Sequence, residues 1–131
     1  IVGKGMNKLR DNYNIPQQIE IFSDVPDLEP YFEDADIMIL PIFTGGGMKV
    51  KTCESLMYGK NIIGTNEAFE GYKLDYNKVG GKCNTPEEFI QKIQDIIENP
   101  IPRFNTYSRQ IFLENHSEDI VIKLFSQILG F

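Results

Sequence analysis

Short apolar runs alternate with segments of helical periodicity along the whole chain. The pattern predicts five strands, over residues 1–3, 18–22, 36–42, 61–65 and 79–83. The run over residues 36–42 is almost entirely apolar, as expected for a strand that is covered on both faces. Strands that alternate with helices are typical of a parallel sheet, so the predicted fold is α/β with helices flanking the sheet.

Helical segments follow the strands. The pattern predicts helices over residues 6–14, directly after Asp27, and over residues 48–58, 86–98, 104–115 and 117–129. Asp27 and Thr85 are placed as N-caps, and Gly59 ends the 48–58 helix. Four residues of that helix are expected to form an apolar stripe facing the sheet: Val50, Cys53, Leu56 and Met57. Residues 66–77 predict a loop with a short helical turn.

The glycine loop (residues 44–47, Thr-Gly-Gly-Gly) lies between a predicted buried strand and the start of a helix. Gly45, Gly46 and Gly47 allow a ligand to approach the backbone without Cβ atoms in the way. The helix that begins near Met48 presents unpaired N–H groups, which favour a phosphate or diphosphate. A tight turn without a ligand is the alternative, because the segment matches neither of the common glycine-rich nucleotide motifs.

Charged residues on the same helix extend this interpretation. Lys49 and Lys51 lie in its first turn, where cations are unfavourable unless an anion is near. Helical spacing brings Gly47, Lys51 and Glu54 onto one stripe, where the Glu54 carboxylate could accept hydrogen bonds from the two hydroxyls of a ribose. An exposed Lys51–Glu54 ion pair is an equally open interpretation.

Composition and charge restrict the classes of function. Of the 131 residues, 41% are hydrophobic and 24% are charged, which suits one soluble globular domain. The net charge of −6 argues against nucleic acid as a partner. Cys53 and Cys83 are too few for a zinc cluster, and His116 has no partner spaced for a metal or a catalytic triad. We therefore expect neither a metal site nor a cofactor.

Two weaker patterns remain open. Gly3-Lys4-Gly5 follows the first strand, and a packing turn is favoured there over a phosphate site. Glu67, Glu70 and Asp75 form a loose acidic group, for which solvated loop charges are favoured over contact with a sugar hydroxyl.

Three stretches together resemble a known family. DIMILP at residues 36–41, the glycine loop, and ESLMYGKNIIGT at residues 54–65 are similar to the C-terminal donor-binding domain of group 1 retaining glycosyltransferases of the GT-B fold. The resemblance covers nearly the whole chain and is most specific in the middle. It implies a Rossmann-like sheet and transfer of a sugar from a nucleoside-diphosphate donor to an acceptor, with retention of configuration.

The resemblance also implies site residues. Glu54 matches the residue that holds the ribose of the donor. The residues that match the diphosphate site are Gly45, Gly46, Gly47, Met48, Lys49 and Lys51. Val25 and Pro26 resemble the segment that flanks the nucleobase, with a plain turn into a helix as the alternative. Gly46 stands where the family motif has a further Glu, so the contacts to the sugar differ from the usual ones. No residue is placed as a general base, and the catalytic residues stay unassigned.

The expected domain organisation follows from the same comparison. Residues 1–131 are expected to form a donor-binding domain that lacks its first strand–helix unit and an N-terminal acceptor domain, because the chain begins with Ile1 inside an apparent strand. The expected partners are a nucleotide-sugar and a glycan or lipid-linked acceptor, as in a hexosyltransferase of polysaccharide biosynthesis. The expected location is cytoplasmic, with peripheral membrane association through the missing domain left open. A non-catalytic Rossmann-like module that binds a nucleotide or another phosphorylated ligand is the alternative function.

Overall fold

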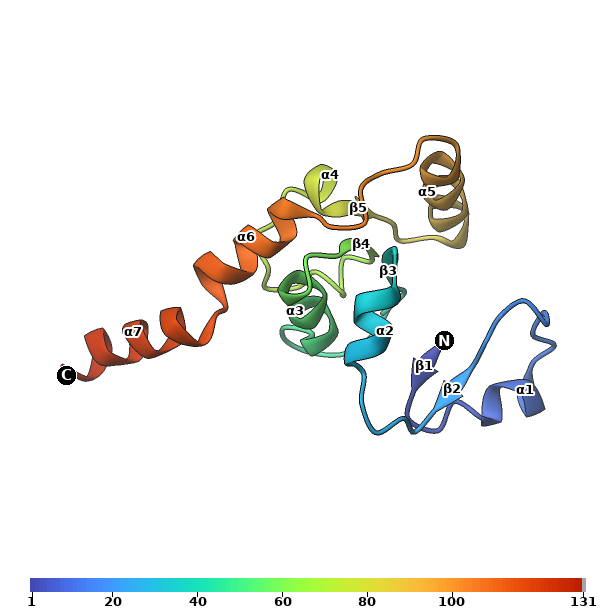
Figure 1. Ribbon diagram of the computed structural model, residues 1–131, viewed down its shortest axis with the longest axis horizontal. Coiled ribbons are helices and arrows are strands. Elements are labelled where there is room, and N and C mark those ends of the chain that lie inside the picture. Colours follow the sequence, from blue (N-terminus) through green and yellow to red (C-terminus); the bar gives the residue numbers. More distant parts are fainter. Residues whose placement is uncertain (131) are drawn as a thin grey trace. The chain divides into compact units, whose positions relative to one another are not determined.

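The computed structural model describes residues 1–130 and divides into two compact units, Ile1–Asp34 and Ala35–Phe131. The first unit holds four short elements (Figure 1): β1 (Val2–Gly3), α1 (Lys8–Asn12), β2 (Phe22–Ser23) and α2 (Glu29–Asp34). β1 and β2 pair in parallel, with Val2 opposite Phe22. The carboxylate of Asp27 accepts a hydrogen bond from the N–H of Glu29 at 2.9 Å, so Asp27 satisfies a backbone N–H at the start of α2 from one residue before the N-cap position.

The second strand is shorter than the apolar pattern predicted. Residues 18–21 are not part of β2, and the backbone of Ile19 makes other bonds. The N–H of Ile19 donates to the carbonyl of Pro16 at 3.0 Å, and the guanidinium of Arg10 donates to the carbonyl of Ile19 at 2.5 Å. The prediction of a strand over 18–22 was therefore wrong except at its last residue.

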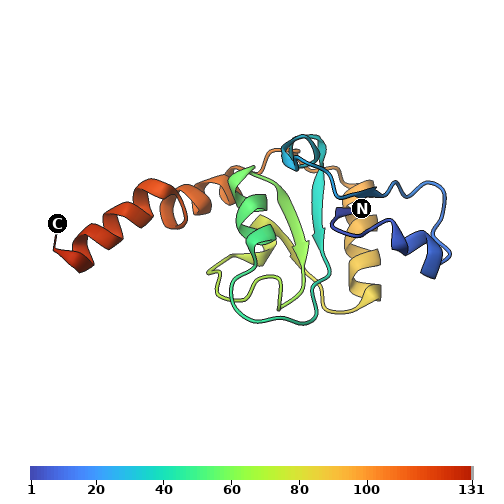
Figure 2. The same ribbon diagram turned by 90° about the horizontal axis from the view of Figure 1, so that it is seen from below.

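The second unit is built on a three-stranded parallel sheet in the order β3 (Ile37–Leu40), β4 (Asn61–Gly64), β5 (Gly80–Lys82). Its helices are α3 (Val50–Met57), α4 (Tyr76–Val79), α5 (Pro86–Glu98), α6 (Thr106–Asn115) and α7 (Glu118–Leu129). α3 and α5 lie on opposite faces of the sheet (Figure 2). The predicted α/β fold with a parallel sheet flanked by helices is confirmed.

The core of this unit has a layer on each face of the sheet, because successive side chains of a strand point to opposite sides. Ile62 packs with Leu56 of α3 on one face, and its neighbour Ile63 packs with Phe89 of α5 on the other. Leu56, Ile62 and Ile63 are all completely buried. The capping box that begins α5 is also confirmed, since Thr85 and Glu88 each accept a hydrogen bond from the other's backbone N–H.

Two predictions of burial were wrong. Ile39 of β3 is 46% exposed, because β3 lies at the edge of its sheet and the layer that includes α5 covers Ile37 but not Ile39. β4 is the strand that is buried at every residue. Val50, expected on the apolar stripe of α3, is 70% exposed.

The buried side of α3 carries hydroxyl groups as well as Leu56. Thr52 and Ser55 are both completely buried. The hydroxyl of Thr52 donates to the carbonyl of Ala68, and that of Ser55 donates to the carbonyl of Lys51, each at 2.6 Å. A buried hydroxyl with a hydrogen-bond partner avoids most of the cost of leaving water. These hydrogen bonds explain how Thr52 and Ser55 can occupy buried positions of α3, where only apolar residues were predicted.

None of the helices within residues 1–130 is long and apolar enough to cross a membrane.

Candidate functional site

The glycine loop lies where the sequence places it, between the carboxyl end of β3 and the start of α3. Gly45 has a φ of 137° and Gly47 a φ of 71°, both in the region that favours glycine. In open parallel sheets the carboxyl ends of the strands are where ligands bind. The loop therefore occupies the position in this unit that the fold itself favours for a ligand.

The backbone of this loop is accessible. A Cβ atom built on Gly46 or on Gly47 would meet no heavy atom of the described residues within 4 Å. Gly46 also has a φ outside the range that demands glycine, so its lack of a side chain is not explained by the local conformation. A ligand that lies against the backbone at Gly46 would explain it.

The start of α3 adds hydrogen-bond donors next to the loop. Lys49 is the N-cap of α3, and its side chain makes no capping hydrogen bond within the described structure. The N–H groups of Thr52 and Cys53 turn back to the carbonyl of Lys49, at 3.1 and 3.3 Å. The N–H groups before Thr52 precede the first hydrogen bond of the helix. They lie at its N-terminal end, which attracts anions.

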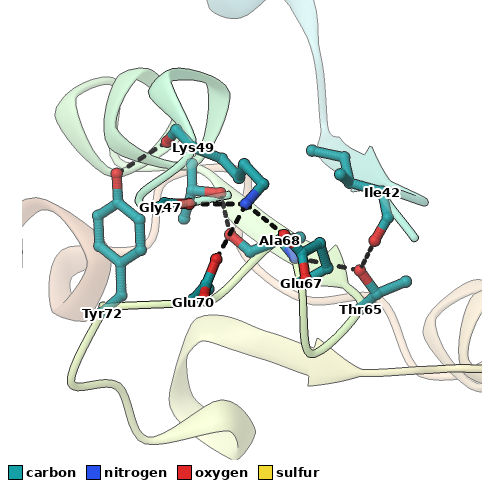
Figure 3. A network of polar contacts seen from close by, with 9 residues as sticks. Ile42, Gly47, Lys49, Thr65, Glu67, Ala68, Glu70 and Tyr72 are labelled. Carbon is teal, nitrogen blue, oxygen red and sulfur yellow. Dashed lines mark hydrogen bonds and ion pairs between the residues drawn. The ribbon is translucent and has the colours of Figure 1, made fainter. Parts of the chain in front are cut away.

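The ammonium of Lys49 is bonded within the protein (Figure 3). It donates to the carbonyl of Gly47 and to Oε1 of Glu67, each at 2.6 Å, and to Oε2 of Glu70 at 3.3 Å. The hydrogen bond that Lys49 donates to Glu67 is the main reason why the pKa of Lys49 is raised above its ordinary value. The sequence predicts an anion beside Lys49, and the structure places two carboxylates of the chain itself there. We call Lys49, Glu67 and Glu70 the Lys49 cluster.

The segment that carries these carboxylates, residues 65–72, is bonded to the start of α3 along its length (Figure 3). The hydroxyl of Tyr72 donates to the carbonyl of Lys49 at 2.8 Å, and that of Thr65 donates to the carbonyl of Ile42. The same Thr65 hydroxyl accepts from the N–H of Ala68 at 3.1 Å. Burial raises the pKa of the Tyr72 phenol to about 12. The 65–72 segment and the residues around the glycine loop thus form one connected structure.

Glu54 and Lys51 lie on α3 one turn apart, and their side chains form an ion pair at 2.9 Å. Both are partly exposed, at 31% and 44% of their side-chain surface. The ion pair that the sequence left open as an alternative is therefore formed. The contact of Glu54 with a ribose stays a prediction.

The remaining candidates belong to the first unit or have structural contacts of their own. Val25 and Pro26 belong to the first unit, in the loop between β2 and α2, so their role beside a nucleobase stays a prediction. Asp75 caps α4 by accepting from the N–H of Asn77 at 3.1 Å. The N–H of Gly5 donates to the carboxylate of Asp24 at 3.1 and 3.2 Å, so the Gly3-Lys4-Gly5 turn already holds an anionic group of the chain.

The thiols and the histidine are also accounted for by packing. Cys53 and Cys83 are free thiols, and burial raises the pKa of each. The ring of His116 packs edge-on against Tyr72, with 5.2 Å between the ring centroids. Within residues 1–130 no group of three or more His, Cys, Asp or Glu side chains is arranged to hold a metal ion.

The comparisons with known proteins decide the family. The family model described as glycosyl transferases group 1 matches residues 1–99. The chain belongs to the group 1 glycosyl transferases. No curated protein and no solved structure matches it. Membership of this family supports glycosyl transfer in general. The matched residues of this group 1 glycosyl transferase include the glycine loop, α3 and the 65–72 segment, whereas α6 and α7 lie beyond them.

Sequence reasoning missed the 65–72 segment as part of the site. Glu67 and Glu70 were noted as an acidic group, but their common partner Lys49 lies 18 and 21 residues earlier in the chain. The one available signal was the position of Lys49 at a helix N-terminus, where a cation is unfavourable and therefore suggests a nearby anion.

Proposed function

We propose that this chain forms the donor-binding half of a retaining glycosyltransferase with the GT-B fold, and that its donor is a nucleoside-diphosphate sugar. The observation that carries the proposal is the open glycine loop at the carboxyl end of β3, directly before the N-terminus of α3. An accessible backbone next to the N-terminus of a helix, which attracts anions, suits a diphosphate. Membership of the group 1 family makes sugar transfer the reaction that such a site serves.

The proposed chemistry is stabilisation of the leaving group. When the bond between the sugar and the diphosphate breaks, negative charge grows on the diphosphate oxygens. N–H donors fixed in position before the reaction stabilise this charge without having to reorganise. In the proposal, Gly45, Gly46, Gly47 and Met48 supply the backbone contacts, Lys51 supplies positive charge, and Glu54 binds the ribose hydroxyls.

The proposal extends to the rest of the reaction. A hexose is the proposed transferred group, and Val25 and Pro26 are the proposed neighbours of the nucleobase. The acceptor is proposed to bind on a further domain of the same protein, which would face the donor and exclude water. Holding two reactants in the correct geometry can lower a barrier by about 7–11 kcal/mol, so the donor half alone should not transfer sugar at a useful rate.

Nucleotide titration of the chain tests the donor site. UDP, GDP and ADP are titrated separately, with NMR detection of backbone amides and calorimetry for affinity. We expect at least one of them to shift the amides of residues 45–48. If none of the three shifts these amides, the donor-site proposal is wrong.

Gly46→Ala is the sharpest variant for this test. The added methyl group meets no described atom and requires no forbidden φ, so the folded state should be as stable as the wild type. Affinity for the nucleoside diphosphate should fall about tenfold or more, because a methyl group would separate the ligand from the backbone by more than hydrogen-bond distance. Gln91→Ala on the exposed side of α5 is the matched control and should leave affinity unchanged.

A further inference from the structure

The hydrogen-bonding capacity of the Lys49 ammonium is fully used. An ammonium group has three donors, and the three acceptors around it are a carbonyl and two carboxylates. The Lys49 side chain is only 13% exposed. With one positive and two negative groups, the Lys49 cluster carries a net charge of −1. A diphosphate that approached Lys49 directly would have to displace a carboxylate and would meet a negative cluster.

The Lys49 side chain also lies beside the two glycines of the loop that have positive φ, Gly45 and Gly47. Its ammonium bonds to the carbonyl of Gly47 at 2.6 Å. A Cβ atom built on Gly45 would lie 3.3 Å from Cε of Lys49 and 3.7 Å from Oε1 of Glu67. Both ends of the triglycine segment therefore lie next to this one side chain, and the Gly47 end is hydrogen-bonded to it.

Glu67 belongs to a segment that is anchored in the core, whereas the glycine loop is exposed. Its neighbours Ala68 and Phe69 are buried, at 0% and 2% exposure. Thr52 of α3 donates to the carbonyl of Ala68 at 2.6 Å, and the Glu67 side chain itself is 25% exposed. The glycine loop, in contrast, is exposed at each of its residues. The 65–72 segment is thus the better anchored of the two.

We propose that Glu67 is a positioning residue, which acts through Lys49 to hold the glycine loop in the conformation that binds the diphosphate. This inference rests on the proposed function for its ligand. In this assignment Lys49 is an internal support that bonds Gly47 on one side and Glu67 on the other. The diphosphate then contacts the backbone of the loop that Lys49 supports.

Glu67→Gln separates this role from direct binding by Lys49, because the two predict changes of opposite sign. If Glu67 positions the loop through Lys49, losing its charge weakens the support, and the affinity for UDP, GDP or ADP falls about three- to tenfold. If Lys49 binds the diphosphate directly, Glu67 competes for the ammonium, and Glu67→Gln raises the affinity. A higher affinity would overturn the proposal.

Glu70→Gln is the matched control. Its carboxylate is farther from the ammonium, at 3.3 Å, and its side chain is 50% exposed, so its effect should be smaller than that of Glu67→Gln. An equal effect would mean that total charge, and not the position held by Glu67, controls affinity. A double-mutant cycle with Lys49→Met tests the pathway, because Glu67→Gln should have no further effect once the ammonium is absent. Additive effects would overturn the proposed action through Lys49.

Amide measurements on the unliganded protein keep the inference separate from the proposed function. Glu67→Gln should shift the amide resonances of residues 45–48 and speed their hydrogen exchange, while the melting temperature and the amides of α5 stay as in the wild type. Unchanged loop amides would overturn the proposal. If the wild type binds none of the three nucleotides, the proposed function is wrong, and the amides alone decide whether Glu67 sets the loop conformation.

Discussion

The carboxylate of Glu54 lies 2.9 Å from the ammonium of Lys51, one turn earlier on α3. A partly exposed ion pair of this kind contributes little to stability, because water and salt screen it and both side chains lose freedom. In this pair the Glu54 carboxylate points toward the Lys51 ammonium. An oriented carboxylate beside a cation is suited to accept hydrogen bonds from vicinal hydroxyls.

Glu54→Gln should therefore weaken binding of a nucleoside diphosphate by about 1–2 kcal/mol, the scale of a lost hydrogen bond to a charged group. Calorimetric titration of the wild type and the variant measures the loss. Unfolding in urea should give the same stability for both proteins, since the ion pair is partly exposed.

A 2′,3′-dideoxy nucleotide is the control for this variant. It lacks the ribose hydroxyls, so it should bind the wild type weakly and should not respond to Glu54→Gln. If both nucleotides lose the same affinity, Glu54 acts on the structure of α3 and not on the ribose.

Local patterns in the sequence predicted most of the fold. The capping box at Thr85 and Glu88 begins α5 where expected, and the alternation of strands and helices predicted the parallel pairing of β3, β4 and β5. These features depend on residues within a few positions of one another. The glycine loop was found for the same reason, because its strand, glycines and helix are consecutive in the chain.

Contacts between distant segments could not be predicted in this way. The burial of Thr52 depends on the carbonyl of Ala68, 16 residues later, and no local periodicity indicates such a partner. Glu67 reaches Lys49 across 18 residues, from a segment that has little regular structure. The sequence thus indicated the glycine loop but not the structure that supports it.

Asn105 joins three parts of the second unit, and its removal should be costly. Its side chain caps α6 by accepting from the N–H of Ser108 at 3.0 Å. Its amide group donates to the side chain of Asn61 and to the carbonyl of Lys78, both at 2.8 Å. Asn105→Ala should cost about 1 kcal/mol for the cap and about 1–3 kcal/mol for the polar groups left without their donor.

Denaturant unfolding checks this prediction, with Asn115→Ala as the control. Asn115 lies at the other end of α6 and is exposed. Its side-chain amide donates to the carbonyl of Ile111 within the same helix. Its removal should change stability by less than about 0.5 kcal/mol. Similar losses for the two variants would show that the bonds of Asn105 to Asn61 and Lys78 contribute nothing of their own.

The pH dependence of stability should include a contribution from His116. Burial against Tyr72 lowers the pKa of His116 below its ordinary value of 6.5, so the folded protein binds a proton less readily than the unfolded chain. Stability falls with decreasing pH wherever the unfolded state binds more protons. The contribution of His116 is therefore complete above its unfolded pKa and is lost as the pH falls from there through the lowered pKa of the folded state.

His116→Gln should remove this dependence, because glutamine does not titrate. As the pH falls from about 7.5 to about 5, the range in which histidine changes charge, the wild type should lose unfolding free energy relative to His116→Gln. Asn115→Ala, which removes a neutral neighbour, should instead give a curve parallel to that of the wild type. If the His116→Gln curve is also parallel, the imidazole is as free to bind a proton in the folded protein as in the unfolded chain, and the packing against Tyr72 does not exclude its charged form.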